Sequence, residues 1–487
     1  MRLLFASLPT YQMRLGKQQA YWHRLRRIGS DKIFEDVTKL RSPSGKTSFC
    51  RGLWLVASAA RRAGHECRWL DISPFDPKLP AEDCEWAEQL WLYAMTPTFH
   101  LCCEFAAQAK NVNPEITVFV GGPHTRYLYA NCLHEHVALD FVEARPATPD
   151  SLAASIKEPS HMPGMARRDG EEVRVNPCEF PKYYSEFGDP LVLAQPLVNY
   201  YFNTSTSRGC CRTCAFCLEG LVPLCLRPVA EVKDELRLLD SHLGLDGAIH
   251  FFDTSLWATP KRCIELCEFI SSEISIQHFS CDIEARRIRD DVLGSLARAR
   301  MRMIAIGFES CRDDVLNFVG KNGSFADRLT IAEHVRRLMP NTAIKAYWLL
   351  GLPGSTEESL RDELSGIRTV LKQGTVDLVS VKLFVPYPGT PFFLHPAHYG
   401  LEVEYDFRRY DRFTVPPVCW PKAVGRELLA DLLIECEKTV AECYAVRLGV
   451  TTQAMAAIKD EPGRYNGPLY VGDAIDTAGM IEAAPCI

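Results

Sequence analysis

The chain has 487 residues, of which 47% are hydrophobic and 24% charged, and its formal net charge is -6. This length allows two or three domains of about 100 to 200 residues each, and the composition is that of folded globular domains rather than of a disordered or fibrous protein. The acidic balance supplies no field that attracts a phosphate backbone, so we expect no nucleic acid partner. No stretch approaches the roughly 20 apolar residues of a membrane span, and the first residues lack an export signal. We therefore expect no membrane association and a cytoplasmic location, with most of the 20 cysteines present as thiols.

The first 145 residues alternate between strand-like and helix-like patterns. Apolar runs predict strands over 2–9, 66–72, 88–95 and 116–122, and helical spacing predicts helices from residue 53 and over 98–112. Gly64 is placed to stop the first of these helices, and a polar insertion of about 40 residues precedes it. Strands separated by helices indicate a parallel sheet with a ligand crevice at the carboxyl ends of its strands. The fold class is therefore α/β, and residues 1–145 are predicted to form a Rossmann-like domain.

The rest of the chain divides into three further regions. Residues 146–200 are irregular and rich in proline and charge, so they are interpreted as a connector. Strand and helix patterns alternate again over 201–395, which predicts a partial or full β/α barrel whose site lies at the strand ends. Residues 396–487 contain a helical pattern over 422–448 and are predicted to form a small, mainly helical capping region.

One segment of the barrel region carries metal-binding chemistry. TSTSRGCCRTCAFCLEG (204–220) places Cys210, Cys214 and Cys217 at Cys-x3-Cys-x2-Cys spacing. Three thiolates on one loop can bind three irons of a four-iron four-sulfur (4Fe-4S) cubane and leave the fourth iron open. The alternative is a chance cluster or a zinc knuckle, and zinc would require a fourth Cys or His ligand nearby. Cys211 is interpreted as a bystander.

This spacing, with Phe216 just before the last cysteine, resembles the radical S-adenosylmethionine (SAM) superfamily. The resemblance implies a 4Fe-4S cluster that reductively cleaves SAM, with an external electron donor such as a flavodoxin or ferredoxin. The matching strand segments are IHFFDTSL (249–256), FSCDIEARRI (279–288), MIAIGFES (303–310) and AYWLLGLPGSTEES (346–359). The SAM contacts that the resemblance implies are Phe216, Asp253, Thr254, Glu284, Glu309, Ser310 and Leu352, with Arg286 beside Glu284. A carboxylate at a strand end is more often a helix cap or an ion-pair partner, which stays the alternative for each of them.

The region before the barrel narrows the resemblance to class B radical SAM methyltransferases, which carry a cobalamin-binding domain. The matching segments are RAGHECRWLD (62–71), NPEITVFVGGPHT (113–125), PGMARRDGEEVRVN (163–176) and LFVPYPGTPFF (383–393). The cobalamin contacts implied are Thr96, Thr98, Gly121, Gly122 and Pro123. The Asp-x-His-x-x-Gly signature of other cobalamin proteins is absent, and FVEARP (141–146) stands where this subfamily often has Gly-Glu-Gly. A Gly-Gly turn without a ligand remains the alternative.

The resemblance implies methylation of an unactivated carbon on a small metabolite or natural-product intermediate. One SAM molecule would supply the methyl group through cobalamin, and a second would yield the 5'-deoxyadenosyl radical. Tyr347, Trp348 and Tyr387 are candidates to line the reaction cavity, although barrel aromatics are more often core. Three alternatives stay open. The same architecture serves cyclisation or rearrangement, it serves aminocarboxypropyl transfer, and the chain could be a cobalamin or iron-sulfur binding module.

Overall fold

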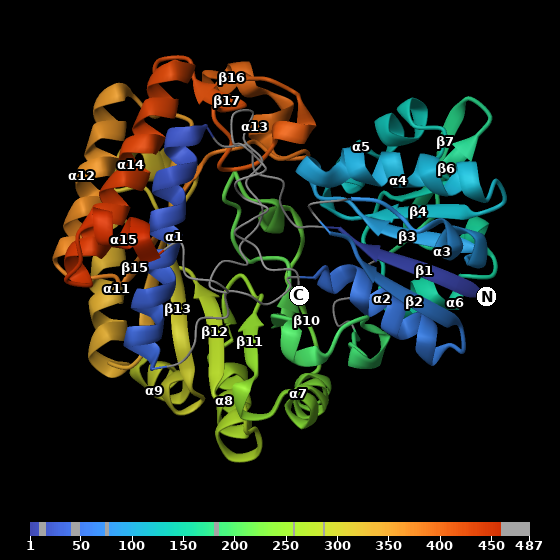
Figure 1. Cartoon of the computed structure of the whole chain (residues 1–487), viewed down its shortest axis with the longest axis horizontal. Coiled ribbons are helices and arrows are strands. Elements are labelled where there is room, and N and C mark those ends of the chain that lie inside the picture. Colours follow the sequence, from blue (N-terminus) through green and yellow to red (C-terminus); the bar gives the residue numbers. More distant parts are fainter. Residues whose placement is uncertain are drawn as a thin grey trace.

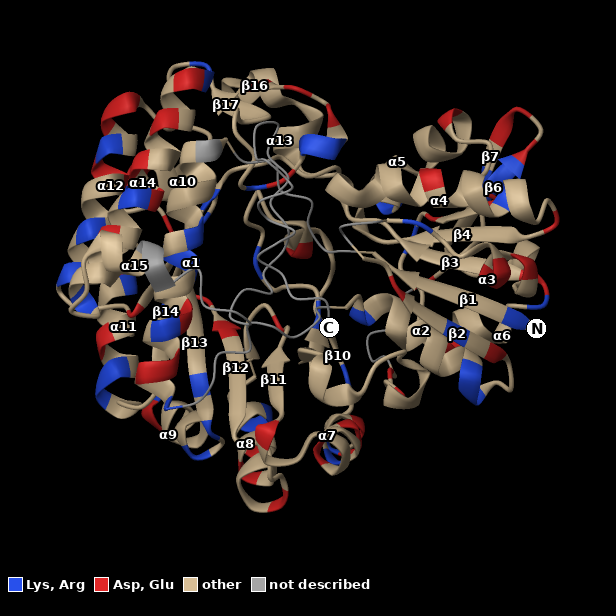
Figure 2. Cartoon of the chain, in the orientation of Figure 1, with Lys and Arg blue, Asp and Glu red and all other residues tan. Residues whose placement is uncertain are grey.

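The computed structural model describes residues 1–8, 16–39, 49–73, 77–179, 185–256, 259–285 and 288–458. These residues form two α/β units that lie side by side, with the cysteine loop in the middle of the molecule (Figure 1). Charged side chains gather on the helices that cover the two units, while most of each sheet is uncharged (Figure 2). None of the helices in the described ranges is long and apolar enough to cross a membrane.

The amino-terminal unit is built on a seven-stranded sheet. In sheet order its strands are β2 (Glu66–Asp71), β1 (Arg2–Ser7), β3 (Gln89–Tyr93), β4 (Thr117–Gly121), β5 (Phe141–Glu143), β6 (Met165–Asp169) and β7 (Glu172–Val175). The first five are mutually parallel. β6 is antiparallel to β5, and β7 is antiparallel to β6. The helices of this unit are α2 (Arg51–Arg62), α3 (Ala81–Trp86), α4 (Phe99–Val112), α5 (Pro123–Glu135) and α6 (Pro149–Ala154). The predicted parallel α/β sheet is confirmed, and its last two strands lie within the segment interpreted as a connector.

The strand order places a ligand crevice between β1 and β3. From β1 the chain adds β2 on one side of the sheet, and it then returns to add β3 and β4 on the other side. Parallel α/β sheets bind ligands at such a switch point, outside the carboxyl ends of the strands. The strands run from the amino terminus at the outer edge of the molecule toward the barrel (Figure 1). The crevice therefore faces the second unit.

The second unit is an open barrel of six parallel strands. In sheet order these are β15 (Leu378–Leu383), β14 (Ala343–Leu350), β13 (Met301–Glu309), β12 (His278–Ile283), β11 (Ala248–Phe251) and β8 (Phe202–Thr204). Its helices are α7 (Val229–Leu243), α8 (Pro260–Glu273), α9 (Asp290–Arg298), α10 (Asp313–Phe318), α11 (Phe325–Leu338) and α12 (Glu357–Lys372). The edge strands β8 and β15 are not paired with each other in the described part of the chain, so the barrel is partial.

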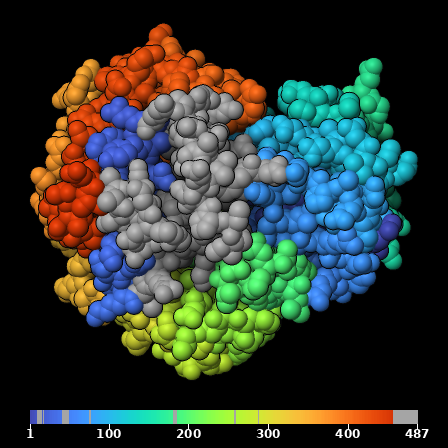
Figure 3. Space-filling view, viewed as in Figure 1, coloured from blue at the N-terminus to red at the C-terminus, as the bar shows by residue number. Residues whose placement is uncertain are grey.

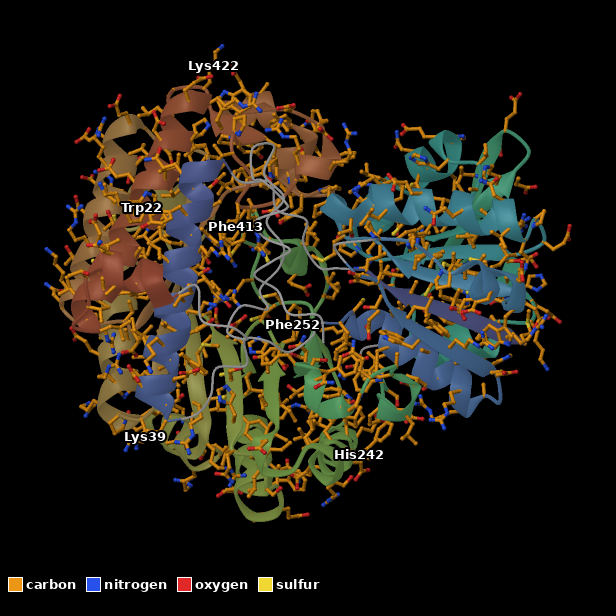
Figure 4. The ribbon with its side chains drawn as sticks, viewed as in Figure 1. Trp22, Lys39, His242, Phe252, Phe413 and Lys422 are labelled. Atoms are coloured by element: carbon orange, nitrogen blue, oxygen red, sulfur yellow. The ribbon has the colours of Figure 1, made fainter. Side chains whose placement is uncertain are left out.

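The first helix, α1 (Lys17–Thr38), belongs to the barrel although it lies between β1 and α2 in the chain. It packs along α14 (Arg426–Arg447) and touches β14 and β15. Arg26 and His23 of this helix contact the buried carboxylate of Glu437 on α14. Trp22 lies beside α14, with the Lys438 ammonium 5.8 Å from its ring (Figure 4). The predicted polar insertion is therefore in part a helix, and in the space-filling view its blue atoms adjoin the carboxy-terminal helices, separate from the amino-terminal unit (Figure 3).

α13 (Pro391–Leu394) and the antiparallel pair β16 (Leu401–Val403) and β17 (Cys419–Pro421) lie at the upper end of the barrel in Figure 1. The last described helix, α15 (Thr452–Ile458), contacts α1 and α14. The predicted mainly helical carboxy-terminal region is confirmed by the two helices that end the described chain.

Candidate functional site

The cysteine loop is closed at its base by a short pair of strands. β9 (Ser207–Arg208) precedes the loop and pairs with β10 (Cys225–Leu226), which follows it. Gly209 starts the loop with a positive φ of +72°, and a Cβ there would lie 2.4 Å from two backbone oxygens of the returning chain. Only glycine fits this turn without strain. The strand pair and the glycine together hold the loop in place.

The three predicted ligands line one large cavity. Cys210, Cys214 and Cys217 all border a space of about 1120 Å³ that is lined by the loop and the barrel strands and extends along α11. Their thiols are free, and burial raises the pKa of Cys214 and of Cys217, so both must lose a proton before they can hold iron. In the described ranges, no three His, Cys, Asp or Glu side chains gather around a point that could hold one metal ion. Three thiols from one loop that border one cavity fit a cluster with separate iron corners.

The predicted SAM contacts fall into two sets. Phe216, Thr254, Glu284 and Glu309 line the cavity, whereas Asp253, Ser310 and Leu352 are buried behind its wall. The Asp253 carboxylate accepts hydrogen bonds from Thr206 and Ser207, which hold the strand that enters the cysteine loop. Ser310 donates to the buried Glu363 carboxylate, and Leu352 packs in the apolar cluster beneath Phe216. Arg286 lies outside the described residues.

Glu309 is held in a strained conformation at the end of β13. Its φ is +62°, a left-handed value that costs a non-glycine residue on the order of 1 to 3 kcal/mol. Its carboxylate accepts a hydrogen bond of 2.9 Å from the ammonium of Lys321, which in turn lies 5.7 Å from the ring of Phe216. A Cβ on Gly307 would lie 2.6 Å from the Glu309 Oε1, so glycine leaves room for this carboxylate. Strain of this kind is concentrated at functional sites.

Cavity residues that were not predicted from the sequence include Arg212, Ser255, Asp282 and Lys321. Within the described chain, the buried Ser255 hydroxyl has no hydrogen-bond partner, which leaves it available to a bound ligand. Ser255 lies in the IHFFDTSL segment, so its position at a strand end was a usable signal. Lys321 lies in the loop between α10 and α11, where no strand pattern pointed to it.

The residues predicted to contact cobalamin follow two neighbouring strands of the amino-terminal sheet. Thr96 and Thr98 follow β3 and are buried, and Gly121 to Pro123 follow the neighbouring strand β4. Gly122 has φ +114°, and a Cβ there would lie 2.5 Å from the Ala94 carbonyl oxygen. Its backbone N–H donates to Glu143 at 2.7 Å. The turn therefore depends on glycine.

His124 supplies the observation that bears on a ligand at this crevice. Its ring is buried against Phe99 and against Phe407 of the carboxy-terminal region, at centroid distances of 4.3 and 5.0 Å. Burial lowers its pKa to about 3, so the ring is neutral, and its Nδ1 has no partner among the residues that the structure describes. An unsatisfied polar atom beside a glycine turn at the carboxyl end of β4 fits a large ligand with a polar rim, such as cobalamin.

The two units are joined beside the cysteine loop by a buried ionic cluster. Glu186 accepts a hydrogen bond of 2.8 Å from Arg51 of α2 and one of 3.1 Å from Arg208, which precedes the loop. Arg51 also donates to the backbone oxygen of Asn203 on β8. Burial alone would raise the pKa of Glu186, but these arginines together with Arg227 lower it to about 2. The cluster ties the amino-terminal unit to the strand that leads into the site.

This shift gives a testable dependence of stability on pH. Because the folded pKa of Glu186 is depressed from 4.5 to about 2, its contribution is complete above the unfolded pKa and is lost as pH falls toward 2. The shift corresponds to about 3 kcal/mol. Glu186→Gln is expected to lower the thermal midpoint at neutral pH, and its deficit relative to wild type should shrink as pH falls below 4.5. Glu158→Gln, on an exposed carboxylate, is the control. A deficit that stays constant with pH would contradict this account.

Comparisons with known proteins assign both units. A family model described as the radical SAM superfamily matches residues 204–365, and a B12 binding domain model matches residues 42–150. The chain is a radical SAM enzyme that carries a B12-binding domain. These two domains imply a 4Fe-4S cluster, SAM and cobalamin as its cofactors.

Two relatives illustrate the similarity in sequence. An uncharacterised methyltransferase of Pyrococcus horikoshii is 22% identical over 377 residues, which cover 74% of this chain and 78% of the relative. Bacteriochlorophyllide d C-12(1)-methyltransferase of Chlorobaculum tepidum is 25% identical over 247 residues, which cover 49% of this chain and 51% of the relative.

Two solved structures share the fold. The radical SAM methyltransferase TsrM from Kitasatospora setae, with cobalamin and a 4Fe-4S cluster bound, superposes with a TM-score of 0.65 at 14% identity and covers 89% of this chain and 90% of that one. The cobalamin-dependent SAM radical enzyme OxsB gives a TM-score of 0.57 at 12% identity and covers 82% of this chain and 56% of that one. At these identities the likeness concerns the fold.

Proposed function

We propose that this chain methylates an unactivated carbon of a small metabolite or natural-product intermediate. The observation that carries the proposal is one cavity of about 1120 Å³ that borders the three cysteines and the barrel strand ends, in a chain whose B12-binding domain turns its crevice toward the barrel. The names of the Pyrococcus and Chlorobaculum relatives and of TsrM, all methyltransferases, support it. When bound, the cluster would supply an electron to SAM and the cobalamin would carry a methyl group.

In this proposal each part of the cavity wall has a separate task. Cys210, Cys214 and Cys217 hold the cluster and leave one iron corner for SAM. Thr254 and Glu309 bind SAM from the ends of β11 and β13, and Glu309 is kept in place by its 2.9 Å contact with Lys321. Asp253 acts as a positioning residue, because its bonds to Thr206 and Ser207 set the entry of the cysteine loop.

The second unit completes the arrangement from the other side. Thr96, Thr98 and Gly121 to Pro123 border the crevice for cobalamin. Tyr127 of α5 packs against Gly389, where a Cβ would lie 2.3 Å from the ring, so the amino-terminal unit and a barrel loop approach closely. Such contact excludes water from the space between them, which radical chemistry requires. An external electron donor such as a flavodoxin or ferredoxin would reduce the cluster.

The products formed from SAM test the proposal. The anaerobically reconstituted protein, loaded with cobalamin, would be incubated with SAM and a chemical reductant. Methyl transfer predicts both 5'-deoxyadenosine and S-adenosylhomocysteine. 5'-Deoxyadenosine without S-adenosylhomocysteine would instead favour cyclisation or rearrangement, the chemistry named by a magnesium-protoporphyrin IX monomethyl ester cyclase that is 24% identical over 368 residues. Methylthioadenosine would indicate aminocarboxypropyl transfer, and intact SAM would indicate a binding module.

A further inference from the structure

The inner wall of the barrel carries two lysines that form no ion pair with any of the described residues. The burial of side chains alternates along β14. Lys345, Tyr347 and Leu349 face inward, whereas Ala346, Trp348 and Leu350 face the helices. On β15 the same alternation turns Lys382 inward. Across the described ranges, neither ammonium group makes a hydrogen bond or a salt bridge. Both lysines are partly buried, and a partly buried ammonium group without an acceptor is unusual.

The two lysines meet at the ring of Tyr347. The Lys382 Nζ lies 4.6 Å from the ring centroid and the Lys345 Nζ lies 5.0 Å from it. Tyr347 itself lines the cavity that borders the three cysteines, and its hydroxyl points to Asp282, 3.4 Å away. The lysines are therefore next to the space in which a substrate would meet SAM.

Charged groups of both signs lie around the two lysines. Arg412 acts on Lys382, and Asp282 is the carboxylate shared by both lysines. The neighbouring Asp411 is buried, which raises its pKa to about 7, and its Oδ2 has no partner within the described chain. Glu309 is already paired with Lys321, and Asp31 of α1 acts electrostatically on Lys345. None of these carboxylates forms an ion pair with either lysine within the described residues.

Burial and neighbouring positive charges lower the pKa of both lysines. Burial, followed by the charge of Arg27 on α1, lowers the pKa of Lys345 to about 8. Burial, Arg412 and Lys345 lower the pKa of Lys382 well below its usual value. A bound anion would offset both effects, because it stabilises the charged ammonium.

We propose that the barrel binds a substrate that bears a carboxylate, with this group held by Lys345 and Lys382 beside Tyr347. The inference rests on the proposed function for the reaction and adds the class of substrate, an organic acid. The carboxylate anchors the molecule on β14 and β15, and its apolar remainder extends toward the cysteine loop. Phe252 at the end of β11 is exposed and lies toward the middle of the molecule, where it provides apolar surface for that remainder (Figure 4).

The test measures the chemical reactivity of the two lysines in the full-length, cluster-loaded protein. Acetic anhydride labels neutral amines, and mass spectrometry reports the extent at each lysine as a function of pH. The probes are millimolar hexanoate and benzoate, with hexanamide and benzamide as uncharged matches and inorganic phosphate as a different anion. We expect Lys345 to titrate near pH 8, and an acid to raise this value by about one unit and slow its acetylation at pH 8 about fivefold. The amides should have no effect.

A matched pair of variants locates the site. Lys382→Met removes one ammonium and keeps the length of the side chain, so the acids should no longer protect Lys345. Lys372→Met, on an exposed residue at the end of α12, should leave protection unchanged. The proposal is overturned if neither lysine is acetylated up to pH 10, if no acid alters their labelling, or if phosphate or SAM alone does so.

The same preparation separates this proposal from the proposed function. SAM cleavage without protection by acids would leave the methyltransferase proposal standing and remove the carboxylate site. Protection by acids without SAM cleavage would leave the carboxylate site standing and remove the methyltransferase proposal. The two readouts are independent because labelling requires neither reductant nor turnover.

Discussion

Cys214→Ala is expected to abolish the broad iron-sulfur absorption of the anaerobically purified protein and to reduce 5'-deoxyadenosine formation to background. The three thiols come from one loop and each would hold a different iron, so the loss of one leaves two corners of the cubane without protein ligands. The corrin bands of bound cobalamin should persist, because the crevice of the amino-terminal sheet lies on other strands.

Cys211→Ala is the matched control for this experiment. Cys211 adjoins Cys210 and borders the same cavity, but it is the exposed cysteine of the loop. We expect its removal to change neither the iron-sulfur absorption nor SAM cleavage. Equal loss in the two variants would mean that the loop, rather than particular thiols, determines cluster binding. Retention of the absorption in Cys214→Ala would contradict the assignment of the ligands.

Gly122→Ala is expected to abolish cobalamin binding while the cluster is retained. The substitution imposes a positive φ of +114° on alanine and places its Cβ 2.5 Å from the Ala94 carbonyl oxygen, so the backbone between β3 and β4 must move. The conformational strain alone is on the order of 1 to 3 kcal/mol, and displacement of two strand ends adds to it. The measurement is the ratio of corrin to iron-sulfur absorption after reconstitution with cobalamin.

Gly170→Ala separates strain from displacement. Gly170 lies in the turn between β6 and β7 with φ +67°, and a Cβ there would meet nothing within 4 Å. It imposes similar backbone strain far from the crevice, so cobalamin should still bind. If Gly122→Ala bound as much cobalamin as Gly170→Ala, the crevice at the switch point would not be the corrin site.

Local patterns were sufficient to predict the cysteine loop and the parallel strands. The Cys-x3-Cys-x2-Cys spacing and the apolar runs of both sheets are each contained within a few residues. The sequence did not show which of two neighbouring residues at a strand end faces the cavity, because side chains alternate between the two faces of a strand. Thr254 faces the cavity while Asp253 is buried, and Tyr347 faces it while Trp348 donates to Glu363.

Contacts between distant parts of the chain had no local signal. Lys321 reaches the cavity from a helical connection, and its role depends on the position of Glu309 on another element. The approach of the two inward lysines to one ring depends on the register of β14 with β15. The packing of α1 on the barrel likewise depends on Glu437, which is about 400 residues later in the chain.

The position of α1 has a consequence for how the protein is made. This helix is synthesised before the barrel strands, but its principal neighbour α14 begins at residue 426. A ribosome that adds about 5 to 20 residues per second therefore needs roughly 20 to 80 s to reach α14. During that interval the apolar side of the helix and its Arg26 have no native contact. Nascent chains of this protein therefore pass through a long stage that is open to chaperones and to aggregation. For the same reason, a fragment that ends before residue 426 should be recovered mainly as insoluble material.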